Sequence, residues 1–154
     1  MEFGSIDREI YIEATPEVVY QVVSVAEHVR AWWADHAEFT SEPGGIGFVA
    51  FGVQSGPDAK HERLTVLEAD PPRRFAFAWV YDEAASAPQA AALTVTFDLV
   101  ASGTGTVLRF TETGFRERGW EGAVLEATYR DHVRGWDVFL PRLGAYAVRL
   151  VSTP

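Results

Sequence analysis

The C-terminal stretch from about Trp120 to Val151 constrains the fold more than any other part of this chain. With the periodicity of an α-helix, its apolar and aromatic side chains fall on one face and its charged side chains fall on the other. The apolar face is expected to hold Leu125, Tyr129, His132, Val133, Trp136, Phe139, Leu140, Leu143, Ala147, Leu150 and Val151, and the polar face Arg130, Asp131, Arg134, Arg142 and Arg149. So long and one-sided a helix needs a large apolar surface to lie on, and the strands before it supply one.

Pro141 lies inside this predicted helix, where it removes the hydrogen bond to the carbonyl of Asp137 and clashes with that carbonyl. A kink is therefore expected there, concave toward the strands, because Pro141 falls on the solvent side of the helix. A break near Gly135 is the alternative, since a glycine costs a helix interior roughly 1 kcal/mol relative to alanine.

Stretches of alternating apolar and polar residues precede the helix and predict strands. They lie at Ile6–Glu13, Ala37–Ser41, Ile46–Val53, His61–Ala69, Phe75–Tyr81, Leu93–Leu99 and Thr106–Thr113. Two short helices are expected after the first strand, one starting at the N-cap Thr15 and Pro16, and one spanning about Ala26 to Trp33. Short turns join the later strands, which indicates antiparallel neighbours. The predicted fold class is α+β, with a twisted antiparallel sheet around the long helix.

Composition limits the kinds of function that this chain can have. Its 154 residues suit one domain (1–154, core about 6–151), large enough to bury a core or enclose a pocket. The absence of cysteine excludes disulfides and thiolate chemistry. A formal charge of −9 argues against nucleic acid or an anionic membrane surface as a partner. Neither a signal peptide nor a membrane-spanning segment is predicted, so a cytoplasmic location is expected.

Several motifs, taken in order, resemble those of a known family. They are Ala14-Thr15-Pro16-Glu17-Val18-Val19-Tyr20, Arg30-Ala31-Trp32-Trp33, Glu42-Pro43-Gly44-Gly45, the run Leu67-Glu68-Ala69-Asp70-Pro71-Pro72-Arg73-Arg74-Phe75-Ala76-Phe77-Ala78-Trp79, Thr94-Val95-Thr96-Phe97, Gly114-Phe115 and Gly135-Trp136. From about Ile10 to Leu150 the chain resembles bacterial single-domain members of the heat-shock-protein-90 ATPase activator-like family, within the START-like and birch-allergen-like (SRPBCC) superfamily. The resemblance implies a helix-grip fold, in which a seven-stranded antiparallel sheet grips the C-terminal helix and leaves a cavity between them.

This resemblance does not extend to chaperone activation. The eukaryotic activators resemble the chain only in their C-terminal domain, and they carry a separate N-terminal domain for chaperone binding. We therefore expect no such second domain within these 154 residues.

Residues on inward faces are the candidates for a ligand site, because core and cavity wall are the same surface in such a fold. The expected cavity residues are Trp32, Trp79, Tyr81, Phe97, Phe110, Glu112, Tyr129, His132 and Trp136. Glu112 is the most informative, since a buried carboxylate is costly unless it is paired or protonated. The alternative places Glu112 at the rim, solvated or hydrogen-bonded to the loop from Gly114 to Trp120. For His132, the alternative is a core histidine satisfied by one neighbour.

Other kinds of site have little support. The four histidines, His28, His36, His61 and His132, include no helical pair at metal-ligand spacing. No serine lies in a nucleophile turn, and Gly44-Gly45-Ile46-Gly47 lacks the lysine and the helix of a phosphate loop. Neither a metal nor a cofactor is predicted.

Three functions remain, in this order. The first is binding of a small hydrophobic or amphipathic molecule between sheet and helix. The second is a cofactor-independent enzyme of the polyketide aromatase/cyclase type, as in superfamily relatives, with Glu112, Tyr129 and His132 as the acid–base candidates. The third is a protein-interaction domain with an exposed patch at Val49, Phe51 and Val53. A homodimer is compatible with each of them.

Overall fold

The computed structural model describes residues 4–51, 60–80, 93–115 and 122–152. Their elements follow in the order β1 (Ser5–Ile12), α1 (Pro16–Ser24), α2 (Ala26–Trp32), β2 (His36–Glu38), β3 (Ile46–Phe51), β4 (Lys60–Asp70), β5 (Arg74–Val80), β6 (Thr94–Ser102), β7 (Gly105–Thr113) and α3 (Gly122–Ser152). This is the predicted order of strand, two short helices, six strands and a long helix. The predicted strand at Ala37–Ser41 is shorter than expected and ends at Glu38.

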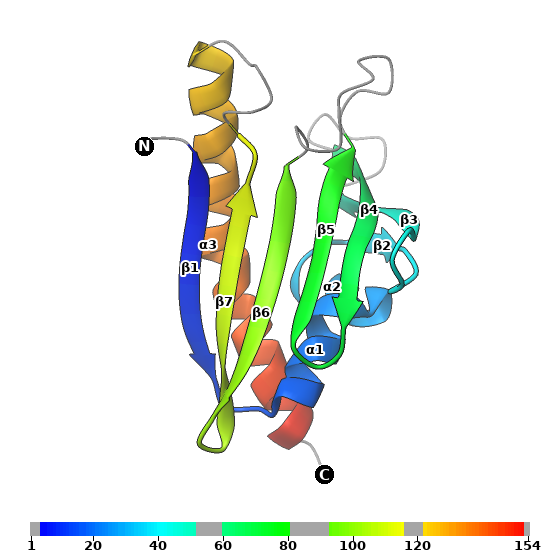
Figure 1. Ribbon diagram of the computed structural model, residues 1–154, viewed down its shortest axis with the longest axis vertical. Helices are drawn as coiled ribbons and strands as arrows, with labels where there is room; N and C mark the ends of the chain where they lie inside the picture. The colour runs from blue at the N-terminus through cyan, green and yellow to red at the C-terminus, as the bar shows by residue number, and fades with distance from the viewer. Residues whose placement is uncertain (1–3, 52–59, 81–92, 116–121, 153–154) are drawn as a thin grey trace.

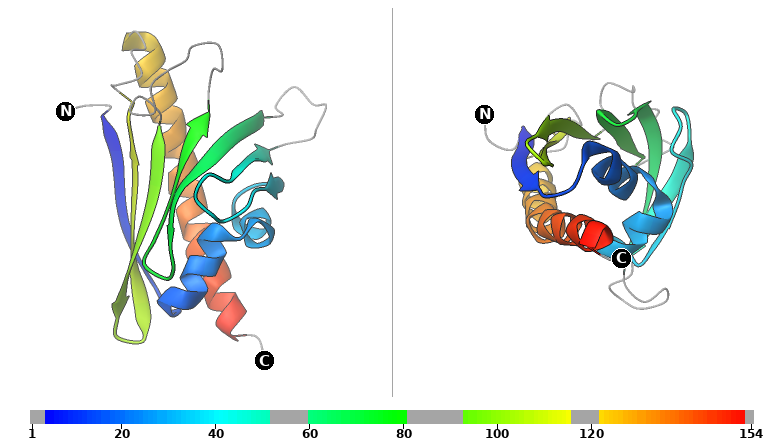
Figure 2. Two further views of the ribbon diagram at one scale, coloured as in Figure 1. Left: turned by 45° about the vertical axis from the view of Figure 1, so that its right-hand side comes forward. Right: turned by 90° about the horizontal axis from the view of Figure 1, so that it is seen from below.

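Within the described residues, seven strands form one antiparallel sheet in the order β1-β7-β6-β5-β4-β3-β2. The sheet is strongly curved, and seen from below it bends around the two short helices and the lower part of α3 (Figure 2). In Figure 1, α3 runs along the length of the molecule behind β1 and β7. The α+β fold in which the sheet grips the C-terminal helix is confirmed.

Local sequence explains how the first elements begin. The Thr15 hydroxyl accepts a hydrogen bond from the backbone N–H of Val18, and Pro16 takes the first position of α1, as predicted for an N-cap. In the turn before β3, Gly44 has a φ of 88°, a conformation that costs little only for glycine. Its N–H donates to the carbonyl of Val66 at 2.8 Å, which ties this turn to β4.

The C-terminal helix is continuous through Gly135 and Pro141, so the alternative of a break near Gly135 is wrong. At the usual rise per residue its 31 residues extend about 45 Å. Pro141 lies on the exposed side, as predicted. Two residues of the predicted apolar face, Leu150 and Val151, are instead 37% and 49% exposed, because the last turn of α3 offers them no partner in the core.

The core lies between the concave face of the sheet and the helices. Its largest fully buried side chains include five phenylalanines: Phe75, Phe77, Phe97, Phe110 and Phe115. From α3, the residues Trp136, Leu140, Leu143 and Ala147 are buried against this layer. The middle of the helix, which carries Trp136, therefore faces the aromatic part of the sheet, and this is where the candidate site lies.

Candidate functional site

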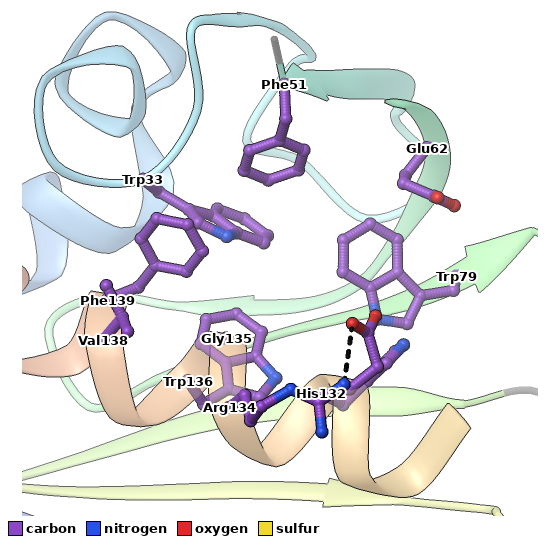
Figure 3. Close-up of a pocket in the computed structure, with 11 residues that line it drawn as sticks. Trp33, Phe51, Glu62, Trp79, His132, Arg134, Gly135, Trp136, Val138 and Phe139 are labelled. Atoms are coloured by element: carbon purple, nitrogen blue, oxygen red, sulfur yellow. Dashed lines mark ion pairs between the residues drawn. The ribbon is translucent and has the colours of Figure 1, made fainter. Parts of the chain in front are cut away.

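A cavity of about 430 Å³ lies beside the middle of α3. It is bounded by the residue after α2, by strands β3, β4 and β5, and by two turns of α3. Its lining residues are Trp33, Phe51, Glu62, Trp79, Asp131, His132, Arg134, Gly135, Trp136, Val138 and Phe139 (Figure 3). The cavity opens to solvent along α3, where the side chains of Asp131 and Arg134 are 52% and 71% exposed.

Aromatic rings form most of the walls. Trp33 lies 5.0 Å from Trp136, 5.7 Å from Trp79 and 6.1 Å from Phe51, measured between ring centroids. Phe51 in turn lies 5.8 Å from Phe139 of α3. Figure 3 shows these rings arranged around a common space. Such walls suit a flat or lipid-like body, because each ring removes apolar surface from water and offers a π-face.

Directly behind this wall, Glu112 of β7 is completely buried. Its carboxylate accepts hydrogen bonds from the indole N–H of Trp79 at 2.8 Å and from the indole N–H of Trp136 at 2.9 Å. The Nδ1 of His132 lies 2.9 Å from both carboxylate oxygens and donates to them. Three N–H donors thus offset the desolvation of one buried carboxylate. The alternative of a solvated Glu112 at the rim is wrong.

The strand register explains why these four residues meet. On β7, Glu112 is opposite Val95 of β6, and Trp79 is on β5, on the far side of β6. Phe77 is opposite Val95, and Trp79 is two residues further along β5 on the same face, so its long indole reaches diagonally past β6 to Glu112. On α3, His132 and Trp136 are one turn apart and present both donors to the same carboxylate.

Charge around His132 favours its protonated form. Burial lowers the pKa of His132, but the hydrogen bond that His132 donates to Glu112 and the negative charges of Glu112, Asp131 and Glu62 outweigh it, so the pKa is raised. The imidazole is partly enclosed, with a side-chain exposure of 17%, and packs edge-to-face on Phe115 at 5.5 Å. When protonated, His132 forms a largely buried ion pair with Glu112.

Of the residues expected to line a cavity, Trp79, His132 and Trp136 do so, and Glu112 holds all three from behind. Phe97 and Phe110 lie deeper, where they pack on Trp136 at 6.4 and 4.5 Å. They support the wall without lining it.

Two expected cavity residues, Trp32 and Tyr129, lie elsewhere. Trp32 is buried in the core and donates its indole N–H to the carbonyl of Val22 at 2.9 Å. Tyr129 packs on Phe115 and donates its hydroxyl to the carbonyl of Ser5 at 2.8 Å. Tyr81 lies outside the described residues, as does Val53 of the expected surface patch. Val49 of that patch is fully buried, so the patch is not exposed there.

Sequence reasoning missed Trp33, Phe51 and Phe139 as cavity residues. Trp33 follows the last residue of α2, and its neighbour Trp32 stacks on it at 5.6 Å. The Trp32-Trp33 pair was the available signal for an aromatic wall near this helix end. Because adjacent residues point in different directions, the pair does not say which of the two rings faces the cavity. Among the described residues, no group of three or more His, Asp or Glu side chains is placed to hold a metal ion.

Comparison with known proteins establishes the family. A family model described as "Activator of Hsp90 ATPase homolog 1-like protein" matches residues 13–147. The chain belongs to this family. Among curated proteins, none matches it in sequence.

Solved structures of low sequence identity share the fold of this activator-like chain. Protein MLL2253 from Mesorhizobium loti has a TM-score of 0.74 at 20% identity, over 94% of this chain and 97% of that one. The Aha1 dimer from Colwellia psychrerythraea has a TM-score of 0.65 at 20% identity, over 91% and 92%. DynU16, a protein of the dynemicin biosynthetic locus, has a TM-score of 0.68 at 20% identity, over 93% of this chain and 46% of that one. Within the described residues, none of the helices is long and apolar enough to cross a membrane.

Proposed function

We propose that this protein binds a small hydrophobic or amphipathic molecule in the cavity beside α3. The observation that carries the proposal is an aromatic cavity of about 430 Å³ backed by the buried Glu112 and its three N–H donors. Ligand sites are typically about 300–1,000 Å³, largely apolar, with a few placed polar groups. An apolar cavity of ~150 Å³ holds one benzene, so this one has room for roughly two fused rings with substituents.

The hydrogen bonds of Glu112 support this proposal because they fix the wall in advance. Two of the three indoles that line the cavity are held by an N–H bond to Glu112, at 2.8 Å for Trp79 and 2.9 Å for Trp136. Rings held in this way lose little freedom when a ligand arrives, which lowers the cost of binding. A core that served stability alone has no need of a buried carboxylate at this point.

Gly135 offers a direct test, because it lies on the wall of the cavity. A Cβ placed there meets only the ring of Phe139, at 3.9 Å, so a larger side chain would extend into the cavity. We expect Gly135→Leu to stay folded and to lose binding of a neutral fluorescent probe such as N-phenyl-1-naphthylamine by at least about tenfold, as for a ligand excluded by bulk. Gly135→Ala is the matched control and should keep most of the binding.

The result that would overturn the proposal is equally plain. If folded wild-type protein binds neither this probe nor any of a panel of fatty acids, the cavity is not a ligand site. If Gly135→Leu binds the probe as well as the wild type does, the probe binds somewhere else. Native mass spectrometry of protein purified without detergent provides a second test, through any small molecule that co-purifies.

A second candidate function, acid–base catalysis, is favoured by the pairing of His132 with Glu112. A carboxylate at 2.9 Å from Nδ1 fixes the imidazole in one orientation and tautomer, and this is how acid–base histidines are held in many enzymes. If a bound molecule is identified, its conversion by the wild type but not by His132→Asn would support catalysis. The structural likeness to DynU16 names no substrate for this chain.

A homodimer is a further expectation that fits the family, since the similar Aha1 from Colwellia psychrerythraea was solved as a dimer. Light scattering coupled to size-exclusion chromatography measures the mass in solution. A mass near that of one chain, 17.0 kDa, at all concentrations would exclude the dimer.

A further inference from the structure

The walls of the cavity expose mainly the carbon atoms of aromatic rings, because two of the indole N–H groups form hydrogen bonds on the side away from the cavity. Trp79 and Trp136 direct their N–H groups to Glu112, which does not line the cavity. The surfaces that they leave for a ligand are therefore π-systems, which carry negative charge on their faces. Trp33 adds a third indole, 5.0 Å from Trp136 and 5.7 Å from Trp79.

Carboxylates add to this negative character. Glu62 of β4 and Asp131 of α3 line the cavity, and Glu112 lies behind it. The guanidinium of Arg134, which also lines the cavity, is 3.6 Å from Asp131 and balances that charge. Burial lowers the pKa of His132, but the charges of Glu112, Asp131 and Glu62 raise it, so these carboxylates favour a positive charge at this end of the cavity.

We propose that the cavity selects amphipathic organic cations, an amine or a quaternary ammonium group on an aromatic or aliphatic body. The cationic group lies against the faces of Trp33, Trp79 and Trp136, on the side of Glu62, and the apolar body contacts Phe51 and Phe139. The proposal deepens the ligand-binding function above and rests on it. Cations are attracted to tryptophan faces more strongly than to those of other aromatic residues, and nearby carboxylates add to the attraction.

A cation in this cavity competes with the proton on His132, because both are positive charges in one small, partly enclosed space. The groups that face His132 are Glu112 from β7, Glu62 from β4, and Asp131 and Arg134 from α3. Histidine is the side chain whose ordinary pKa lies near neutral pH, so His132 is the group whose charge the cation opposes there. Cation affinity should rise as pH increases through the pKa of His132, and anion affinity should fall.

The test uses three probes that share a naphthylmethyl body: the trimethylammonium cation, the neutral alcohol and the sulfonate anion. Their affinities for the wild-type protein are measured by calorimetry from about pH 5.5 to about pH 8.5, the range in which a histidine titrates. The cation should bind roughly threefold to thirtyfold more tightly than the alcohol, the range expected for a cation over indole faces. The anion should bind most weakly, and only the cation should gain affinity as the pH rises.

A pair of variants separates local charge from the overall charge of the protein. Glu62→Gln removes a carboxylate at the cavity, and Glu126→Gln removes one from an exposed site on α3, where it pairs with Arg130. Both change the net charge equally, but only Glu62→Gln should reduce the preference for the cation. The urea midpoint of each variant confirms that it is folded.

Four results would overturn this inference. They are equal binding of cation and alcohol, a preference for the anion, a cation affinity that falls with rising pH, and equal effects of the two variants. In each case the neutral probe can still bind, so the ligand-binding function survives. If none of the three probes binds, both proposals fail together.

Discussion

Glu112→Gln is the substitution that most directly tests how the site is held together. The glutamine has the same shape, but it accepts through one oxygen and donates through an amide group. Its oxygen can satisfy one of the two indole N–H groups, and its NH₂ then faces the other, donor against donor. A buried unsatisfied N–H costs about 1–3 kcal/mol.

Loss of the charge also removes the ion pair with His132. Breaking a buried pair by neutralising one partner costs about 3–5 kcal/mol, because the other charge is left buried. Here His132 is 17% exposed and can release its proton, so the lower end of that range applies. Added together, the unsatisfied N–H and the broken ion pair should lower the free energy of unfolding of Glu112→Gln by about 4–6 kcal/mol.

The matched control is Asp137→Asn, which also neutralises a carboxylate in a contact between α3 and the sheet. Asp137 bonds to Arg8 at 2.8 and 3.3 Å, distances close to those around Glu112, but its side chain is 51% exposed. Solvent screens such a pair, and its loss should cost no more than about 1 kcal/mol. Both free energies come from urea titrations near neutral pH, followed by far-ultraviolet circular dichroism.

The comparison sets a buried carboxylate with three donor residues against an exposed one held by a single arginine, over similar hydrogen-bond distances. If Glu112→Gln costs less than about 1 kcal/mol, or no more than Asp137→Asn, then the reasoning about the buried cluster is refuted. A stable Glu112→Gln protein that no longer binds the neutral probe would instead assign Glu112 to ligand binding directly.

Three further predictions concern stability. Because the pKa of His132 is raised in the folded protein, its ion pair with Glu112 contributes fully below the unfolded pKa and is lost as pH rises through the folded pKa. The free energy of unfolding should fall above about pH 6.5, and urea titrations at several pH values should show a smaller fall in Glu112→Gln. Leu140→Ala, at a buried position of α3, should lower the free energy of unfolding by about 2–5 kcal/mol in the same titrations. Arg142→Ala, at an exposed position, should lower it by well under 1 kcal/mol. Equal losses would mean that the helix faces are misassigned. Gly135→Ala should stabilise the protein by up to about 1 kcal/mol, because alanine favours the helix and its Cβ meets only Phe139, at 3.9 Å. The urea midpoint should therefore rise. A lower midpoint would show that the space around residue 135 is tighter than this contact indicates.

Much of the fold could be predicted because periodicity along a chain is a local property. Alternation places Ile6 and Ile12 on one side of β1, and both are buried. Helical spacing places Trp136, Leu140 and Leu143 on one face of α3, and all three are buried against the sheet. Short turns between the strands indicate antiparallel pairing, which the structure has throughout.

The ends of elements were harder to predict, since periodicity does not say where packing stops. Leu150 and Val151 continue the apolar stripe of α3, yet they lie beyond the part of the core that could cover them. The break near Gly135, which was the alternative to a kink at Pro141, does not occur, because tertiary packing on both sides of Gly135 outweighs a propensity cost of roughly 1 kcal/mol.

The sequence by itself determined that Glu112 starts toward the concave face and that His132 and Trp136 share the inward face of α3. It did not determine that all of them meet Trp79. That meeting depends on the register of β5, β6 and β7, on the position of α3 along the sheet and on the reach of the Trp79 indole past β6. These are long-range relations that no local pattern encodes. Only the tertiary structure decided that Trp33, and not Trp32, faces the cavity and that a carboxylate is fully buried behind three N–H donors.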